Sequence, residues 1–121
     1  MQETQQSTKG NMKLSICDVG GEVIKDNETY TLKDNKTLKN LVLSSTDLKA
    51  GQSTRGHSHP GQEEVYYFVS GKGSIQIDND LYNAEPGDVF LIPDGAFHKV
   101  FNGSDTETLY FVCVFDGKRS H

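Results

Sequence analysis

The chain has 121 residues, which suffice for one hydrophobic core and leave no room for a second domain of ordinary size. Its 12 basic and 17 acidic residues give a formal charge of −5, and no basic run is interleaved with aromatic residues, so we expect no nucleic-acid partner. The longest apolar run, 109–115, is far shorter than the roughly 20 residues that span a bilayer, so we expect no membrane partner either.

The chain begins with a polar segment, 1–11, rich in Gln, Ser and Thr. We expect a flexible N-terminal arm there and a single domain over 12–121. The arm lacks the basic start and the apolar stretch of a secretory signal, which favours a cytoplasmic location.

Short apolar segments follow the arm, separated by turn signals such as Pro60-Gly61 and Pro86-Gly87. They predict strands over 13–17, 39–47, 52–58, 64–70, 73–78, 81–84, 89–92, 97–102 and 108–115. Residues 26–39 are polar and without clear periodicity, which predicts a loop or a weak hairpin. Many short strands without a long helix indicate an all-β sandwich or barrel.

Two cysteines, Cys17 and Cys113, lie in strand-like segments. Buried free thiols that behave as small apolar residues are the favoured interpretation. A disulfide between them stays open, because spacing alone does not decide it. Neither cysteine has a catalytic arrangement around it.

The segment 51–64 places two imidazoles and a carboxylate within eight residues. Residues two apart in an extended chain point the same way, so His57 and His59 can face one point. The turn at 60–61 then lets Glu64 approach that point from the start of the next strand. His98, which follows a Pro-x-Gly turn, can complete the set. Such ligands suit one divalent ion of Fe, Mn, Ni or Zn.

Two motifs with these residues resemble the cupin pattern. Residues 51–71 fit G-x5-HxH-x4-E-x6-G, and residues 87–102 fit G-x5-P-x-G-x2-H-x3-N. The resemblance implies a double-stranded β-helix, or jelly-roll barrel, over 12–121, with His57, His59, Glu64 and His98 as metal ligands. The spacing to Gly71 selects Glu64 over its neighbour Glu63. The alternatives are a solvated surface His-x-His and a barrel whose metal site has decayed, and the complete ligand set disfavours both.

Strand parity extends the site along the chain. Tyr66 and Phe68 share the face of Glu64, and Val100 shares the face of His98, so all three should line a mostly apolar pocket. Tyr66 is the candidate catalytic residue, because its phenol could orient a substrate by a hydrogen bond. Core packing is the alternative for both aromatic residues.

Metal cupins include dioxygenases, oxalate-type decarboxylases and sugar-phosphate isomerases. The resemblance therefore implies a metal-dependent enzyme on a small polar metabolite, of the sugar or sugar-phosphate isomerase type or the oxygen-dependent dioxygenase type. A non-catalytic small-molecule or metal-binding and sensing module is the alternative. An isomerase acting on a sugar phosphate would need cations near the mouth of the site. Arg55, Lys72 and Lys99 are available for this, although solvated surface charge is favoured for each. We also expect a homodimer, with 13–17 contributing to the interface.

Overall fold

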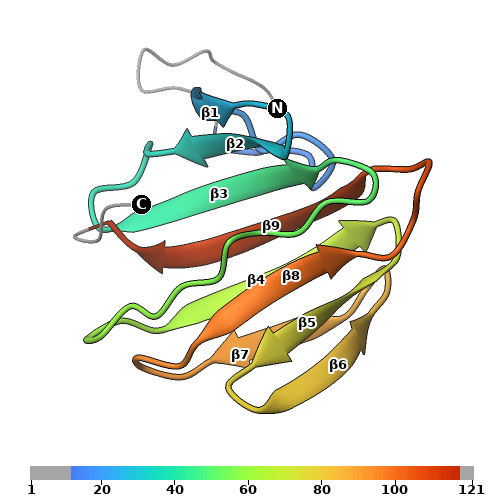
Figure 1. Cartoon of the computed structure of the whole chain (residues 1–121). Helices are drawn as coiled ribbons and strands as arrows, with labels where there is room; N and C mark the ends of the chain where they lie inside the picture. The colour runs from blue at the N-terminus through green and yellow to red at the C-terminus, as the bar shows by residue number, and fades with distance from the viewer. Residues whose placement is uncertain (1–11, 118–121) are drawn as a thin grey trace.

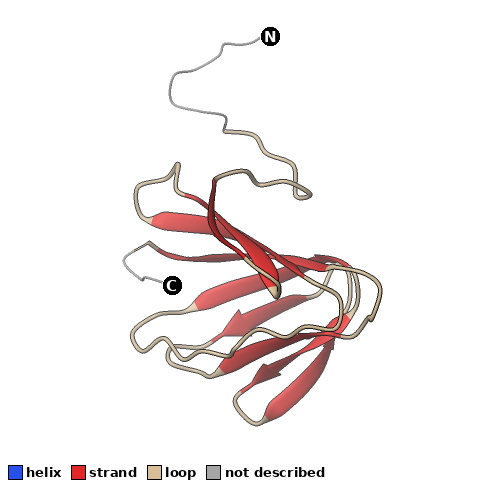
Figure 2. Ribbon diagram, turned by 45° about the horizontal axis from the view of Figure 1, so that its top comes forward, coloured by secondary structure: helices blue, strands red, loops and turns tan. Residues whose placement is uncertain are grey.

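The structure is a computed structural model that describes residues 12–117, so the predicted arm over 1–11 lies outside the described residues. This part of the chain forms strands and no helix (Figure 2). The strands are β1 (Glu22–Asp26), β2 (Tyr30–Asn35), β3 (Leu41–Leu48), β4 (Glu64–Ser70), β5 (Gly73–Ile77), β6 (Asp80–Ala84), β7 (Val89–Ile92), β8 (His98–Asn102) and β9 (Leu109–Asp116). No helix in residues 12–117 is long and apolar enough to cross a bilayer.

The strands form two antiparallel sheets that face each other as a jelly roll (Figure 1). The larger sheet has the order β1-β2-β3-β9-β4-β7, and the smaller has the order β6-β5-β8. Side chains alternate along β4, where Glu64, Tyr66 and Phe68 are buried and Val65 is exposed. The inward residues of both sheets make one core, in which Phe68 and Ile75 are fully buried. The predicted all-β jelly-roll fold is confirmed.

Residues 26–39 contribute to a hairpin of β1 and β2, the second of the two alternatives that the sequence left open. The turn between the strands is held by the Asn27 side chain, whose Oδ1 accepts hydrogen bonds from the backbone N–H groups of Thr29 and Tyr30 at 2.8 and 2.9 Å. Leu32 and Asp34 are both buried on β2. The alternation of buried and exposed residues on β2 does not show as an apolar pattern, because one of its buried residues is the charged Asp34.

The predicted strand over 13–17 does not form. Instead the segment makes a tight turn, in which the N–H of Asp18 donates to the Ser15 carbonyl at 3.0 Å. It lies over the outer face of the larger sheet, where the Tyr110 hydroxyl donates to the carbonyl of Ile16 at 3.1 Å. Val19 completes a small second core there with Tyr110 and Val112. This cover explains why β9 is buried on both faces and reads as a continuous apolar run.

Both cysteines are free thiols. Cys113 is buried as expected, whereas Cys17 is exposed, because the segment that carries it forms a turn on the surface rather than a core strand.

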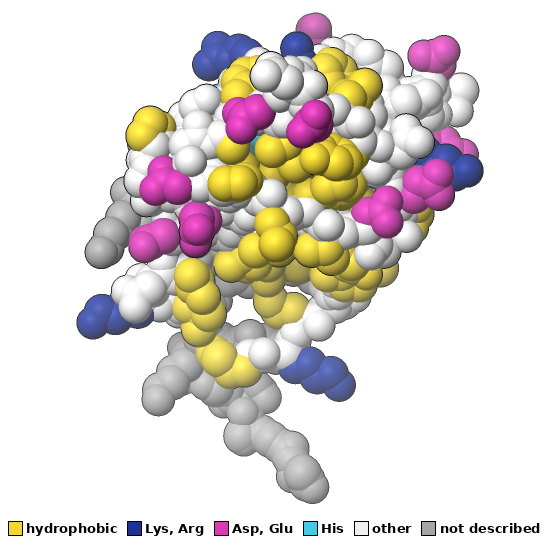
Figure 3. All heavy atoms as spheres, turned by 90° about the horizontal axis from the view of Figure 1, so that it is seen from below, with side chains coloured by type: hydrophobic (Ala, Val, Ile, Leu, Met, Phe, Trp, Pro, Cys, Tyr) yellow, Lys and Arg dark blue, Asp and Glu magenta, His cyan; other side chains and the backbone are white. Residues whose placement is uncertain are grey.

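Apolar side chains are exposed where the edge strands β6 and β7 lie. Leu81 on β6 is 66% exposed, and Leu91 on β7 is 70% exposed. Figure 3, which views the molecule from below Figure 1, shows hydrophobic side chains gathered in the middle of this face with acidic groups around them.

Candidate metal centre

The loop that carries the first two histidines runs along β8 without becoming a strand. The N–H of Asn102 donates to the Gln52 carbonyl, and the N–H of Thr54 donates to the Val100 carbonyl, both at 2.9 Å. Further along, His57 and His98 exchange two backbone hydrogen bonds of 3.0 and 2.9 Å. The loop advances by three residues from Thr54 to His57 while β8 advances by two. The expectation of a regular strand over 52–58 is therefore wrong, because one extra residue interrupts the ladder as a bulge does.

Gly56 supplies that extra residue. Its φ of +89° lies in the region that L side chains rarely adopt. A Cβ at this position would lie 2.6 Å from Cζ of Phe97. Only glycine therefore satisfies both the backbone conformation and the close ring. The result places His57 directly opposite His98.

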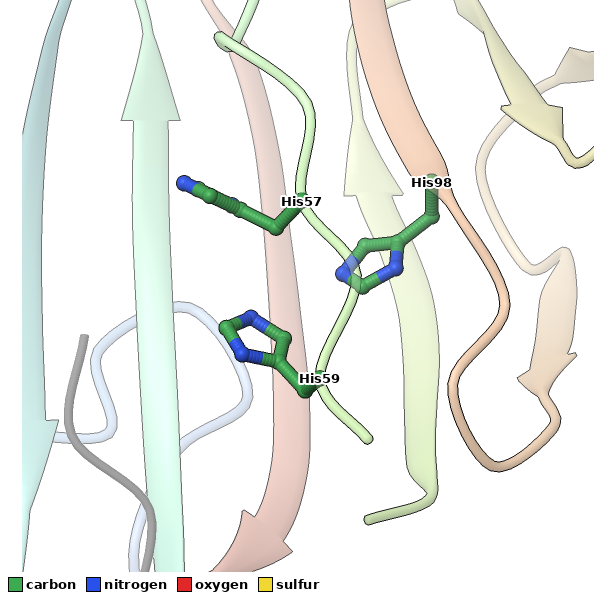
Figure 4. A group of neighbouring side chains, drawn as sticks. All are labelled: His57, His59 and His98. Atoms are coloured by element: carbon green, nitrogen blue, oxygen red, sulfur yellow. The ribbon is translucent and has the colours of Figure 1, made fainter. Parts of the chain in front are cut away.

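The three histidines gather at one point. One ring nitrogen from each of His57, His59 and His98 lies within 4.8 Å of the other two. The ring centroids are 5.3 Å apart for His57 and His59, and 5.7 Å apart for His59 and His98. Figure 4 shows His57 and His59 on the loop and His98 reaching toward them from β8. His98 is buried, His59 is half-buried and His57 is exposed, so the cluster opens to solvent at His57.

Glu64 lies beside this cluster, in contact with His98. It is the first residue of β4 and is buried, whereas Glu63 is exposed, as strand parity predicts. Oε2 of Glu64 lies 3.1 Å from Nε2 of His98. The close group of three histidine nitrogens does not include a Glu64 oxygen.

The donor set fits a divalent cation. Nδ1 of His98 lies 3.1 Å from the carbonyl oxygen of Ala96, which can only accept a hydrogen bond, so Nδ1 carries a hydrogen. Nε2 then faces the Glu64 carboxylate oxygen. Two hydrogen-bond acceptors attract each other only when a proton or a metal ion lies between them. Two further imidazoles beside this pair form a nitrogen and oxygen set typical of borderline metals.

A cavity of about 60 Å³ begins at this cluster and extends between the sheets. It is lined by Tyr30, Leu32, Ser44, Thr46, Thr54, His57, His59, Glu64, Tyr66, His98, Phe111 and Cys113. Tyr66 lies in this wall as predicted, with its ring stacked on Phe111 at 5.5 Å and edge-on to His98 at 5.6 Å. Phe68 and Val100 are buried in the core and do not line the cavity, which corrects the expectation from strand parity. Parity selects the inner face but does not tell how far along it the cavity reaches.

Sequence reasoning missed several residues of the wall. Tyr30 and Leu32 come from β2, where the sequence pattern predicts a loop or a weak hairpin. Cys113, to which no chemistry was assigned, lies next to Tyr66 across the β4–β9 pair and also lines the cavity. Its parity with Phe111 on β9 was the available signal, because alternate residues of a strand share one face.

Comparison with known proteins places these features in a family. The cupin domain family matches residues 45–115, which is more than half of the chain. An RmlC-like cupin from Shewanella frigidimarina has the same fold, with a TM-score of 0.71 at 17% identity over 83% of this chain and 86% of that one. A Bacillus subtilis oxalate decarboxylase studied for its Mn(II) centres aligns with a TM-score of 0.72 at 24% identity, over 83% of this chain and 29% of that one.

Sequence relatives carry different activities in their names. A 5-aminosalicylate 1,2-dioxygenase of Comamonas is 31% identical over 69% of this chain and 22% of its own length. A glucose-6-phosphate isomerase of Thermococcus onnurineus is 27% identical over 78% of this chain and 56% of its own length. An uncharacterized protein of Methanocaldococcus jannaschii is 26% identical over 71% of this chain and 78% of its own length. The chain thus spans only part of the length of the dioxygenase and of the isomerase. The motifs, the jelly roll and the family match together show that the chain belongs to the cupin family.

Proposed function

We propose that this cupin is a metal-dependent enzyme that acts on a small polar metabolite, with one divalent ion per chain held by His57, His59, Glu64 and His98. The observation that carries the proposal is the convergence of three histidine nitrogens within 4.8 Å, beside a buried carboxylate, at a cavity. A purely structural barrel has no need of this arrangement, because an apolar pair in place of the buried Glu64 and His98 would avoid the cost of removing both polar side chains from water.

A divalent ion in such a site supplies Lewis acidity and a coordination position for a substrate or for water. The residues around the site would bind and orient the substrate. Tyr66 borders the cavity next to His98, and we propose that its phenol orients the substrate by a hydrogen bond. Leu32 and Phe111 give the wall an apolar part that excludes water from the substrate.

The size of the cavity limits what enters it. About 60 Å³ leaves room for a small group of the substrate, since one water molecule needs roughly 10–15 Å³ on the same measure. A whole sugar would therefore extend beyond this cavity toward solvent at His57. The dioxygenase and the isomerase, which are similar in sequence to this chain, support a reaction on a small polar metabolite.

The test is a turnover screen against a library of metabolites, with the parent protein loaded with the ion it retains on purification. We expect turnover that His59→Ala abolishes and that the exposed control Glu63→Gln preserves. Turnover with redox-inactive zinc would select the isomerase type over the oxygen-dependent type. Metal binding without turnover of any class would reject the enzyme and select the alternative, a non-catalytic binding or sensing module.

A further inference from the structure

A second cavity, of about 490 Å³, adjoins the metal cluster on its solvent side. It is lined by Lys25, Asn27, Thr29, Tyr30, Ser53, Thr54, Arg55, His57 and Lys99. Three of these residues, Tyr30, Thr54 and His57, also line the cavity at the metal cluster. The two cavities therefore share part of their walls, and the larger one has the volume for a further group of the metabolite.

The second cavity is strongly basic in a protein of formal charge −5. Its lining includes Lys25, Arg55 and Lys99 and no acidic residue. None of these three cations forms an ion pair with any residue of the described part of the chain. The acidic neighbour of Lys25 is Asp26, which lies 4.0 Å from Nζ of Lys49 and accepts a hydrogen bond from Thr31. The positive charge of the cavity thus lacks a counter-charge within its wall.

The three cations come from separate segments that the fold brings together. Lys25 follows a bulge in β1, between Val23 and Lys25 in the pairing with β2, and bulges redirect side chains. Arg55 lies in the irregular loop next to Gly56, whose Cβ position would lie 3.5 Å from the Cβ of Lys99. Nζ of Lys99 lies 5.2 Å from the centre of the Phe101 ring, a contact that orients the ammonium group.

Neutral donors accompany the charges. Oγ1 of Thr54 accepts the N–H of Val100 at 2.9 Å, which directs the hydroxyl hydrogen elsewhere, and Ser53 and Asn27 add further polar groups to the wall. A guanidinium with ammonium and hydroxyl groups beside it suits the oxygens of a carboxylate or a phosphate.

We infer that this cavity, with Lys25, Arg55 and Lys99, binds an oxyanion group of the substrate, a carboxylate or a phosphate, while another part of the same molecule reaches the metal cluster. The inference rests on the proposed function, because it takes the metal cluster as the place of reaction. It also separates three cations that the sequence treated alike: Arg55 and Lys99 line the cavity, and Lys72 does not.

The test measures binding of inorganic phosphate and of malonate to the full-length chain by calorimetry. Arg55→Gln and Lys99→Gln remove one positive charge each from the cavity, and Lys72→Gln removes one from the exposed surface as a matched control. We expect saturable binding of at least one anion, weakened about tenfold or more by each cavity variant and less than twofold by the control. If the cavity variants lose more affinity for phosphate than for malonate, the oxyanion is a phosphate. The opposite result identifies it as a carboxylate.

Absence of saturable binding by the parent at 10 mM anion would overturn the inference, as would equal losses in Lys72→Gln and Arg55→Gln. His59→Ala separates this proposal from the proposed function, because His59 lines only the cavity at the metal cluster. Anion binding that persists in His59→Ala supports the basic cavity whether or not the chain binds a metal. Anion binding that disappears in His59→Ala, while the variant stays folded, would contradict a separate oxyanion site.

Discussion

Alanine at Gly56 is the sharpest perturbation of the local geometry that builds the metal centre. The residue has a φ of +89°, and a left-handed conformation costs an L residue about 1–2 kcal/mol. The added Cβ would also lie 2.6 Å from Cζ and 2.9 Å from Cε1 of Phe97, and such overpacking typically costs about 1–3 kcal/mol. Together the two effects predict a loss of about 2–5 kcal/mol of unfolding free energy. For a chain of this length that corresponds to a midpoint lower by roughly 8–20 °C.

The same substitution should weaken metal binding. His57 follows Gly56 directly, so relief of the clash with Phe97 displaces the loop and moves His57 relative to His98. We expect a metal affinity at least tenfold lower, measured by titration against a competing chelator, alongside thermal unfolding followed by circular dichroism. A small displacement suffices, because ligation depends on distances that vary by only tenths of an ångström.

Gly87→Ala is the matched control. Gly87 has a φ of +95°, and a Cβ there would have no atom within 4 Å. Backbone strain alone should lower the free energy of unfolding of this variant, by about 1–2 kcal/mol. Its metal affinity should stay within twofold of that of the parent. The reasoning would be refuted if Gly56→Ala behaved like Gly87→Ala in both stability and metal affinity.

Three further predictions test other parts of the molecule. Tyr66→Phe should keep the metal and lose turnover or substrate affinity, and a variant equal to the parent with the true substrate would assign Tyr66 to core packing. Burial raises the pKa of the Asp47 carboxyl, with Asp18 adding to the rise and Lys33 opposing it. The native state then holds this proton more tightly than the unfolded state, so the contribution of Asp47 to stability is present at low pH and is lost as pH rises through the raised pKa. Asp47→Asn should therefore raise the unfolding midpoint more at about pH 7 than at about pH 3.5, and equal shifts at both would contradict this. Light scattering at tens of micromolar should give twice the 13.4 kDa chain mass, and the mass of a single chain would exclude the homodimer.

The residues that follow local rules were predictable from the sequence. The strands 64–70 and 89–92 coincide with β4 and β7, because their alternation and their turns are both strong signals. The spacing of His57 and His59 and the Pro-x-Gly turn before His98 also indicated which imidazoles would meet. The motif spacing to Gly71 selected Glu64, and the opposite strand parity of Glu63 agrees with its exposure.

What escaped prediction depends on contacts between distant segments. The segment 13–17 has the apolar composition of a strand, but it forms a turn over the outer face of the larger sheet. The Tyr110 hydroxyl holds this turn by donating a hydrogen bond to the Ile16 carbonyl. The requirement for glycine at position 56 comes partly from the ring of Phe97, which precedes β8 and which no local pattern of the loop reveals. Lys25 joins Arg55 and Lys99 only because the β1–β2 hairpin folds over the mouth of the cavity. Tertiary packing decided each of these cases.

The metal content of the purified chain is the most direct test of the central claim that the four residues form one metal centre. Elemental analysis of protein prepared without added metal should find about one divalent ion per chain. It should find the same in Glu63→Gln and much less in His59→Ala, with the quadruple alanine variant of His57, His59, Glu64 and His98 retaining none and keeping a β-rich circular dichroism spectrum. A folded quadruple variant that retained its full complement of metal would contradict the account.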